Sequence, residues 1–228
     1  MPVPKEQRHP SRSIITWSGL TALPWRNGGG VTRQILSRRL DATGAWVSST
    51  DSDWDWRLSI ADVDTPGPFS PFEGMTRILT VIEGASITLT VDGSIVELER
   101  HRPFSFDGGA NTSAEIPHGP IRDLNLIMRT GTMSAEVRIE PLTTDRPLVM
   151  VNGTYSVLLE GQASLTETVA HADNTAVLNA KLERFDTVLG DTNVPRTITG
   201  EGTIAVITIA VAPPASSPLS PTDHAGLR

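Results

Sequence analysis

The glycine-rich segment 23–33 is the first place in the chain where residue types and spacing could serve chemistry. It reads LPWRNGGGVTR, and three consecutive glycines allow positive φ angles and a close approach of the backbone to a ligand. The segment has neither the Gly-Lys-Ser/Thr ending of a P-loop nor a GxGxxG pattern, so it does not support phosphate binding. Two interpretations stay open: the loop holds Trp25, Asn27 and Thr32 against a ligand, or Trp25 is a packing anchor in a turn.

A second segment, 53–63, reads DWDWRLSIADV and alternates apolar and polar residues. On a strand, Trp56 and Leu58 would share one face, while Arg57 and Ser59 would share the other. The first face is predicted to be core. The second could point into a barrel cavity, where Arg57 would offer a fork of donors to a carboxylate. The alternative is an outer face on which Arg57 is solvated.

The third segment, 117–129, reads PHGPIRDLNLIMR and places Asp123 and Asn125 on one face of a strand. Their side chains would be about 7 Å apart along the strand. The pair could orient a polar ligand, or Asp123 could form an ion pair with Arg57 or Arg77. An ion pair that only stabilises the fold is favoured over general-base chemistry.

Metal binding and covalent catalysis find little support. A metal site would need two or three histidines and a carboxylate that converge. The five histidines are isolated and form no H-x-H: His9, His101, His118, His171 and His224. His118, on a Pro-Gly turn before Asp123, is the one candidate for chemistry. There is no cysteine, no Gly-x-Ser-x-Gly and no Ser-x-x-Lys, which excludes thiolate sites and the common nucleophile signatures.

Composition narrows the class of protein. The chain has 228 residues and a formal net charge of −7, whereas nucleic-acid binders usually carry a basic surplus, so no nucleic-acid partner is expected. No apolar run approaches the roughly 18 residues of a membrane helix, and the N-terminus has no apolar region typical of a signal peptide. We therefore expect a cytoplasmic protein with no membrane partner.

The elements that must position these residues are predicted to be strands. Apolar residues alternate in several segments, and Gly and Pro, 19 and 17 residues, punctuate the chain densely. The fold class is therefore all-β, as a sandwich, jelly roll or barrel. Segment 174–182 fits either a short helix or a strand.

A weak internal repeat indicates two lobes. ILTVIEG at 78–84 resembles YSVLLEG at 155–161, and each is followed by another strand. A second pair, PFSFD at 103–107 and DTVLGD at 186–191, leads in each copy into a loop and a last apolar strand. We predict disordered tails at 1–13 and 212–228, a first β-barrel at 14–130 and a second at 131–211.

With these segments in place, the chain resembles the HutD/Ves family of cupin-like proteins. The resemblance rests on the segments 23–33, 55–61 (DWRLSIA), 67–74 (GPFSPFEG), 77–84 (RILTVIEG) and 123–128 (DLNLIM). It implies a bicupin, two cupin-type β-barrel or jelly-roll lobes from one chain. Cupins carry two motifs that supply metal-binding His and Glu. Here the region just before Glu83-Gly84 has no His, and Arg122 stands near the place of a metal-binding His, so the resemblance implies that the metal site is lost.

The function expected from the residues and the resemblance together is a metal-free bicupin that binds a small anionic metabolite. The resemblance connects the family with histidine utilisation and suggests urocanate or N-formylglutamate as the ligand and a regulatory role. No metal or other cofactor is expected. The predicted ligand-binding residues lie in the first barrel: Trp25, Asn27, Thr32, Arg57, Ser59, Arg77, Asp123 and Asn125.

Two other function classes remain open. One is a metal-independent isomerase or hydrolase that uses Asp123 or His118 as general base. The other is a protein-interaction module with a vestigial pocket, which a flat apolar patch without converging polar groups would favour. Because cupins commonly pair through edge strands, the resemblance also suggests a homodimer.

Overall fold

The computed structural model describes residues 13–49, 53–171, 174–190 and 194–213. The predicted tails lie outside these ranges, apart from Ser13, Ala212 and Pro213. Ser13 is buried, and its carbonyl accepts a hydrogen bond of 2.8 Å from the amide of Leu189. It therefore belongs to the folded part of the chain. Within the described ranges, no helix has the length and apolar character that crossing a membrane requires.

Strands make up nearly all of the regular secondary structure in the described residues, as the alternating sequence predicts, and one short 3-10 helix, η1 (Trp17–Gly19), accompanies them. Segment 174–182, for which helix and strand were both open, is strand β16. The strands are β1 (Ile14–Ile15), β2 (Ala22–Pro24), β3 (Gly30–Leu40), β4 (Trp46–Ser48), β5 (Trp56–Val63), β6 (Gly67–Pro68), β7 (Met75–Glu83), β8 (Ser86–Val91), β9 (Ser94–Glu99), β10 (Phe104–Asp107), β11 (Thr112–Glu115), β12 (Ile121–Arg129), β13 (Met133–Leu142), β14 (Leu148–Met150), β15 (Thr154–His171), β16 (Asn174–Leu182), β17 (Thr187–Leu189) and β18 (Arg196–Val211).

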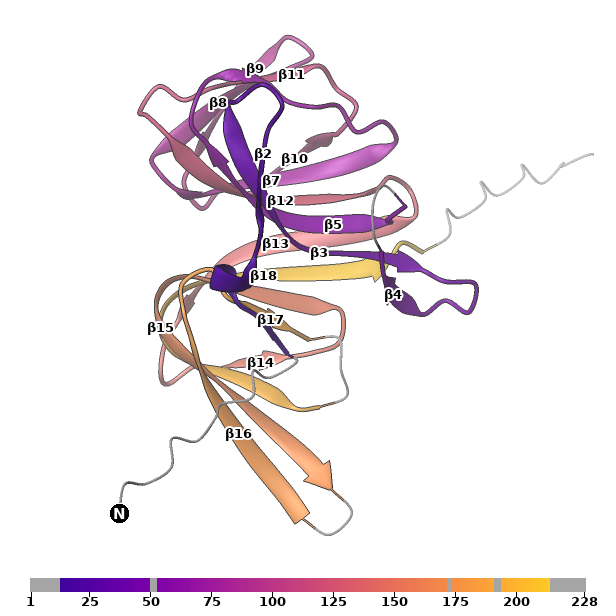
Figure 1. Ribbon diagram of the computed structural model, residues 1–228, viewed down its shortest axis with the longest axis vertical. Helices are drawn as coiled ribbons and strands as arrows, with labels where there is room; N and C mark the ends of the chain where they lie inside the picture. The colour runs from indigo at the N-terminus through magenta and orange to yellow at the C-terminus, as the bar shows by residue number, and fades with distance from the viewer. Residues whose placement is uncertain (1–12, 50–52, 172–173, 191–193, 214–228) are drawn as a thin grey trace, which may run out of the picture.

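Two sheets form the front lobe, the upper part of the molecule in Figure 1. One sheet has the order β10-β7-β12-β5-β3-β2, with β4 beside β3, and the other has the order β6-β11-β8-β9. Apolar side chains fill one end of the space between them, among them Leu79, Val81, Ile87 and Leu89. We call the six-strand path with β4 the front sheet.

The back lobe consists of one strongly bent sheet in the order β1-β17-β15-β18-β13, with β14 beside β18 and β16 beside β15. Its hairpin β15–β16 forms the lower end of the molecule in Figure 1. The interior of this lobe is mostly apolar and includes Leu158, Leu165, Ile198, Ile204 and Val206. It also holds a buried ion pair between Arg196 and Glu167 at 2.7 Å.

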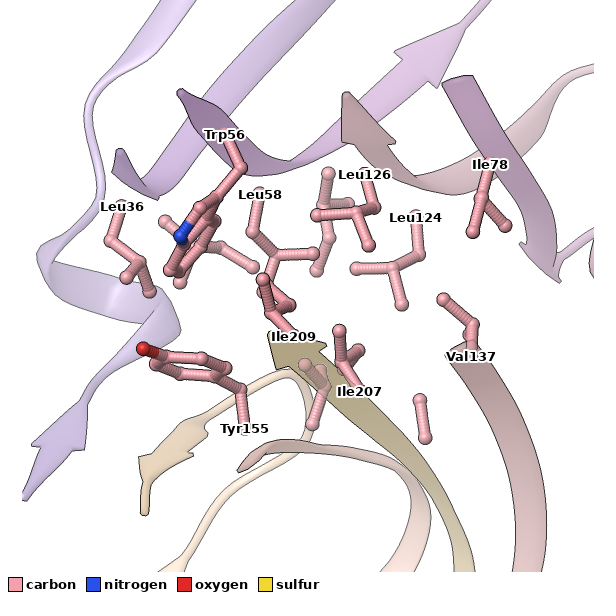
Figure 2. Packing of buried hydrophobic residues seen from close by; sticks show 14 of the residues in the cluster. Leu36, Trp56, Leu58, Ile78, Leu124, Leu126, Val137, Tyr155, Ile207 and Ile209 are labelled. Carbon is pink, nitrogen blue, oxygen red and sulfur yellow. The ribbon is translucent and has the colours of Figure 1, made fainter. Parts of the chain in front are cut away.

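The largest apolar cluster joins the two lobes, as Figure 2 shows. Trp56 and Leu58 from the front sheet face Tyr155 and Ile207 from the back lobe. The rings of Trp56 and Tyr155 lie 5.0 Å apart between centroids. The face of 53–63 that was predicted to be core is therefore the contact between lobes. Its burial leaves the opposite face, with Arg57 and Ser59, to line the interior of the front lobe.

The internal repeat is visible as matching irregularities in β7 and β15. In each copy, the pairing with the last strand of the lobe skips the fifth residue, which is Ile82 in 78–84 and Leu159 in 155–161. The seventh residue of each copy is a glycine with a left-handed backbone, Gly84 at φ +88° and Gly161 at φ +89°. Chance similarity between two unrelated strands would not place a bulge and a left-handed glycine at the same positions.

A third shared feature completes the comparison of the copies. His101 and Phe185 both have positive φ angles, 65° and 68°. The amide of His101 donates to the carbonyl of Val81 at 2.8 Å, and the amide of Phe185 donates to that of Leu158 at 2.7 Å. Val81 and Leu158 are both the fourth residue of the repeat. The two lobes are thus copies of one β unit, which is the arrangement of a bicupin.

The predicted division after residue 130 falls in the turn between β12 and β13. The N-terminal strand crosses this division, however, because Ile14 of β1 pairs with Val188 of β17. The segment 14–130 therefore contributes its first strand to the back lobe and the rest to the front lobe.

Candidate functional site

A cavity of about 520 Å³ opens in the front lobe, between the front sheet and the segments that precede β3 and follow β6. Among the described residues, three arginines line it, and no aspartate, glutamate or histidine does. The chain as a whole carries a net charge of −7, so this lining is opposite in sign to the protein. The lining residues are Leu23, Pro24, Trp25, Arg26, Asn27, Thr32, Gln34, Arg57, Ser59, Ala61, Pro68, Phe69, Ser70, Phe72, Arg77, Asn125 and Ile127.

Strand register brings the polar floor of the cavity together. Ile127 on β12 pairs with Arg57 on β5 and with Arg77 on β7, so the two arginines flank it at the same level. Asn125, two residues earlier, pairs with Ser59. Because side chains two residues apart share a face, all four polar groups point into the same space.

Arg77 lies at the bottom of the cavity and is 8% exposed. Its guanidinium carbon lies 4.4 Å from the ring centroid of Phe69 and 5.6 Å from that of Phe106. Its Nε donates a 2.7 Å hydrogen bond to Oδ1 of Asn125. Burial lowers the pKa of Arg77 to about 10, Asp123 opposes this effect, and Arg57 adds to it. Arg77 therefore stays charged at neutral pH.

Arg57 is half-buried and held by aromatic rings. Its guanidinium carbon lies 5.1 Å from the ring centroids of both Trp54 and Phe72. Burial lowers its pKa as well. Its buried Nε has no hydrogen-bond partner among the described residues, and no carboxylate within those ranges forms an ion pair with Arg57 or Arg77. The floor thus offers donors that the protein itself does not use.

Asp123 is fully buried behind Asn125 and does not line the cavity. The side-chain amide of Asn125 donates to Oδ1 of Asp123, whereas Oδ2 of Asp123 has no hydrogen-bond partner in the described structure. Burial raises the pKa of Asp123 to about 7, Arg77 works against this rise, and Asp62 adds to it. Of the eight residues predicted to bind a ligand, Asp123 alone is separated from the cavity.

The glycine-rich segment forms the rim, and both interpretations of Trp25 describe part of what it does. Its Nε1 donates to Oγ1 of Thr32 at 2.7 Å, and its ring meets that of Phe69 edge-on at 6.3 Å between centroids. Trp25 is therefore a packing anchor and a wall of the cavity at once. Asn27 uses its Oδ1 to accept from the amide of Gly29 at 3.0 Å, which shapes the loop.

The structure explains why one of the three consecutive glycines, Gly30, has to be a glycine. A Cβ atom at this position would lie 2.1 Å from the carbonyl oxygen of Asp62, on the neighbouring strand β5. Only glycine allows the backbone of β3 to begin so close to β5, and this approach sets where the loop 25–29 stands over the cavity.

Several lining residues were not predicted. Phe69 and Phe72 hold the two arginines by stacking, and they lie in segment 67–74, which entered only through the family resemblance. Arg26 stands next to Trp25 on the exposed rim, and Gln34 follows Thr32 by two residues along β3. Because residues two apart share a face of a strand, the sequence could have predicted that Gln34 lines the cavity beside Thr32. The loop after β6 has no periodicity that could have indicated Phe72.

The back lobe has no such floor. Asp123 pairs with Val81 and Ile204 pairs with Leu158, so Asp123 and Ile204 occupy equivalent positions in the two copies. By the same register, Val206 stands where the front lobe has Asn125. Apolar residues thus replace the polar relay in the second copy, and Ile204 and Val206 belong to its filled core.

The lining does not fit a metal ion. Among the described residues, no three His, Asp or Glu side chains gather in a group that could hold one. Arg122, which the resemblance places near a metal-binding His, lies on the face of β12 opposite to Asp123, away from the cavity. It forms ion pairs with Asp62 and Glu83, and its guanidinium carbon lies 5.2 Å from the ring centroid of Trp17. His118 is exposed on a turn and does not line the cavity.

Comparison with known proteins agrees with this architecture. The sequence matches the HutD family over residues 18–206. This chain belongs to the HutD family. It is 40% identical over 114 residues to an uncharacterized 21.2 kDa protein in the hutC 3′ region of Pseudomonas putida, covering 46% of this chain and 52% of the relative. It is 35% identical over 121 residues to protein Ves of Citrobacter koseri, covering 52% and 59%. The chain thus spans little more than half the length of these curated relatives.

Solved structures extend the similarity across both lobes. HutD from Pseudomonas fluorescens SBW25 superposes with a TM-score of 0.66 at 28% identity and covers 88% of this chain and 99% of that one. Oxalate decarboxylase from Lactobacillus farciminis has a TM-score of 0.58 at 9% identity and covers 93% and 89%. The second similarity concerns the fold alone.

Proposed function

We propose that this HutD-family protein binds a small carboxylate in the front-lobe cavity, without a metal ion and without turnover. The observation that carries the proposal is the charge of the cavity lining, which among the described residues includes Arg26, Arg57 and Arg77 and no acidic side chain. A bound anion would offset the repulsion between Arg57 and Arg77, whose mutual effect already contributes to the lowered pKa of Arg77.

The state of the arginines supports recognition of a planar anion. Stacking on Trp54 and Phe72 holds the Arg57 guanidinium in place before a ligand arrives. A guanidinium fork matches both oxygens of a carboxylate, and little side-chain freedom is then lost on binding. A second argument is that no described carboxylate forms an ion pair with Arg57, so a bound anion would supply its counter-charge.

The size and the walls of the cavity favour a metabolite over an inorganic ion. A volume of about 520 Å³ lies in the range of sites for small organic molecules. Trp25, Phe69 and Phe72 provide an apolar wall for the uncharged part of such a ligand, while Ser59 and Asn125 add polar groups at the floor.

The names of the Pseudomonas relatives, HutD and a protein of the hutC region, refer to histidine utilisation. They support an intermediate of histidine breakdown as the ligand, with urocanate and N-formylglutamate as the candidates. Binding without turnover would suit a regulatory protein that reports the level of the intermediate. Neither Asp123 nor His118 reaches the cavity, so no observation favours the enzyme that uses one of them as general base.

Thermal shift tests the proposal, because a ligand that binds only the folded state raises its melting temperature. We expect urocanate or N-formylglutamate to raise the melting temperature at pH 6.5, and the uncharged amides of the same compounds to have no effect. Arg57→Ala should weaken binding by roughly 1.5–3 kcal/mol, about 10- to 150-fold, if it makes a charged hydrogen bond. Arg77→Ala should do the same.

A matched control is Arg138→Ala on the back lobe, where Arg138 is half-exposed and pairs with Glu140 at 3.1 Å. This variant should bind like the wild type. Equal affinity of the wild type, Arg57→Ala and Arg77→Ala would refute the arginine clamp. Turnover of either compound would replace the binding proposal with an enzyme.

A further inference from the structure

A chain of hydrogen bonds connects the cavity to a carboxyl group that no ligand can touch. Arg77 donates from Nε to Oδ1 of Asn125 at 2.7 Å, and Asn125 donates from Nδ2 to Oδ1 of Asp123. Asn125 and Arg77 line the cavity, whereas Asp123 is 0% exposed. The Oδ1 of Asn125 thus accepts from the Arg77 guanidinium, and its Nδ2 donates to the Asp123 carboxyl group. These two bonds fix the orientation of the Asn125 amide group.

Oδ2 of Asp123 is the open end of this relay. It is buried and has no hydrogen-bond partner among the described residues. An ionised carboxylate with one unpartnered oxygen in an apolar setting is poorly stabilised. A neutral carboxylic acid in the same place costs less, because the hydrogen bond that it lacks is weaker than the one that a charged oxygen would make. The site therefore suits a group that carries a proton on Oδ2 for part of the time.

The charges that act on Asp123 come from the two strands that flank β12, with Arg77 on the same face of the sheet and Asp62 on the opposite face. Arg77 on β7 favours the ionised form, and Asp62 on β5 disfavours it. Asp62 is itself ionised: burial works against its charge, but hydrogen bonds from Arg122 and Arg33 outweigh this and lower its pKa. Arg57 acts on Asp123 only through its neighbour Arg77. Arg77 is therefore the main counter-charge that keeps Asp123 ionised.

We propose that the cavity takes up its carboxylate ligand together with one proton, which Asp123 holds on Oδ2. The inference rests on the proposed function and adds the coupling to it. Asp123 is a positioning residue that acts through Asn125 and Arg77. The proton comes from solvent, an O–H bond forms on Asp123, and no other covalent bond changes. Anion and proton enter together, so the net charge of the site does not change.

The direction of the coupling follows from charge. A ligand carboxylate bound to Arg77 neutralises the positive charge that otherwise stabilises ionised Asp123. The ligand-bound state therefore favours the protonated form of Asp123. Because such coupling is reciprocal, protonation of Asp123 must strengthen anion binding by the same factor. The pKa of Asp123 is raised to about 7 in the free protein. Affinity should therefore be constant below pH 7 and fall above it, by up to about tenfold per pH unit.

Isothermal titration calorimetry with N-formylglutamate between pH 6 and 9 tests this coupling, because both carboxylates of this probe remain ionised over the range. Runs in two buffers of different ionisation enthalpy measure proton uptake, and we expect about half a proton near pH 7, approaching one at pH 8. Asp123→Asn mimics the protonated acid. This variant should keep the affinity of the wild type at pH 6, lose the fall towards pH 9, and take up no proton.

Asp53→Asn is the matched control, because the Asp53 side chain is 81% exposed and lies outside the cavity. It should reproduce the pH profile of the wild type. If urocanate binds and N-formylglutamate does not, the comparison of wild type with Asp123→Asn uses urocanate, whose imidazole contributes equally to both.

The outcomes separate the two proposals. Binding that is independent of pH and takes up no proton in the wild type overturns the coupling and leaves carboxylate binding in place. Absence of binding of both probes at every pH overturns both. If Asp123→Asn does not fold, the two-buffer measurement on the wild type decides by itself.

Discussion

Asp123 should make the stability of the fold depend on pH in a direction that is unusual for an aspartate. Burial carries its pKa from 3.8 to about 7, so between these values the folded state holds a proton that the unfolded state has released. Stability should therefore fall as pH rises from about 4 to 7 and then level off. At about 1.4 kcal/mol per pH unit, the full effect is about 4 kcal/mol. We expect roughly 2–4 kcal/mol, because local rearrangement around an ionised Asp123 would reduce it.

Asp123→Asn isolates this effect, because the amide is neutral at every pH and similar in shape to the protonated acid. Urea denaturation at pH 5 and pH 8.5 measures the free energy of unfolding. At pH 5 the variant should already be more stable than the wild type by about 1–2 kcal/mol, and at pH 8.5 it should be more stable by roughly 2–4 kcal/mol. A variant that is less stable than the wild type by the same amount at both values would refute the reasoning. It would show that Asp123 is ionised and well stabilised in the folded protein.

Two further predictions concern the rim of the cavity. Gly30→Ala should lower the melting temperature and weaken binding of N-formylglutamate, because the added Cβ would lie 2.1 Å from the carbonyl oxygen of Asp62. An unchanged melting temperature would show that β3 and β5 can separate at little cost. Thr32→Val removes the acceptor that holds the Trp25 indole at 2.7 Å and should cost about 1 kcal/mol of stability or less while weakening binding. Because the chain has five tryptophans, the fluorescence of Trp25 is measured as the difference between each protein and the same protein carrying Trp25→Phe, and its change with temperature would report whether the ring has become mobile. If the indole stays fixed in Thr32→Val, the contact with Phe69 is sufficient to hold it in place without the hydrogen bond to residue 32.

The relation between the lobes shows how duplication can leave one site. Both copies keep the bulge at Ile82 or Leu159 and the left-handed glycine that follows, because these features shape the sheet. Inward-facing positions are free to differ. Asp123 and Asn125 correspond to Ile204 and Val206, so the front lobe has a polar floor at positions where the back lobe has apolar side chains. The filled copy provides a firm support for the front sheet through the cluster in Figure 2.

Much of the fold was open to prediction from sequence. Alternation of apolar residues predicted strands, and it correctly separated Trp56 and Leu58 from Arg57 and Ser59. The repeat at 78–84 and 155–161 predicted two lobes. Pairing of β1 with β17 was not open to prediction, because two residues, Ile14 and Ile15, carry too little pattern to indicate a distant partner.

The site was predictable in part. The glycine-rich segment and two strands indicated Trp25, Arg57 and Asn125, and all three line one cavity. Phe72 stacks on Arg57 from a loop without periodicity, so nothing in the sequence alone connected the two residues. Whether each residue binds a ligand remains a prediction.

By itself, the sequence determined which side chains share a face of a strand, since neighbours two residues apart are set by the backbone. It assigned Asp123 and Asn125 to one face, and that assignment is correct. Only the tertiary structure decided that this face closes around a cavity, that Asn125 reaches it, and that Asp123 lies behind it without contact to solvent. The reason is that depth depends on how segments far apart in the chain pack over a strand, and this packing also determines the charge that Asp123 can carry.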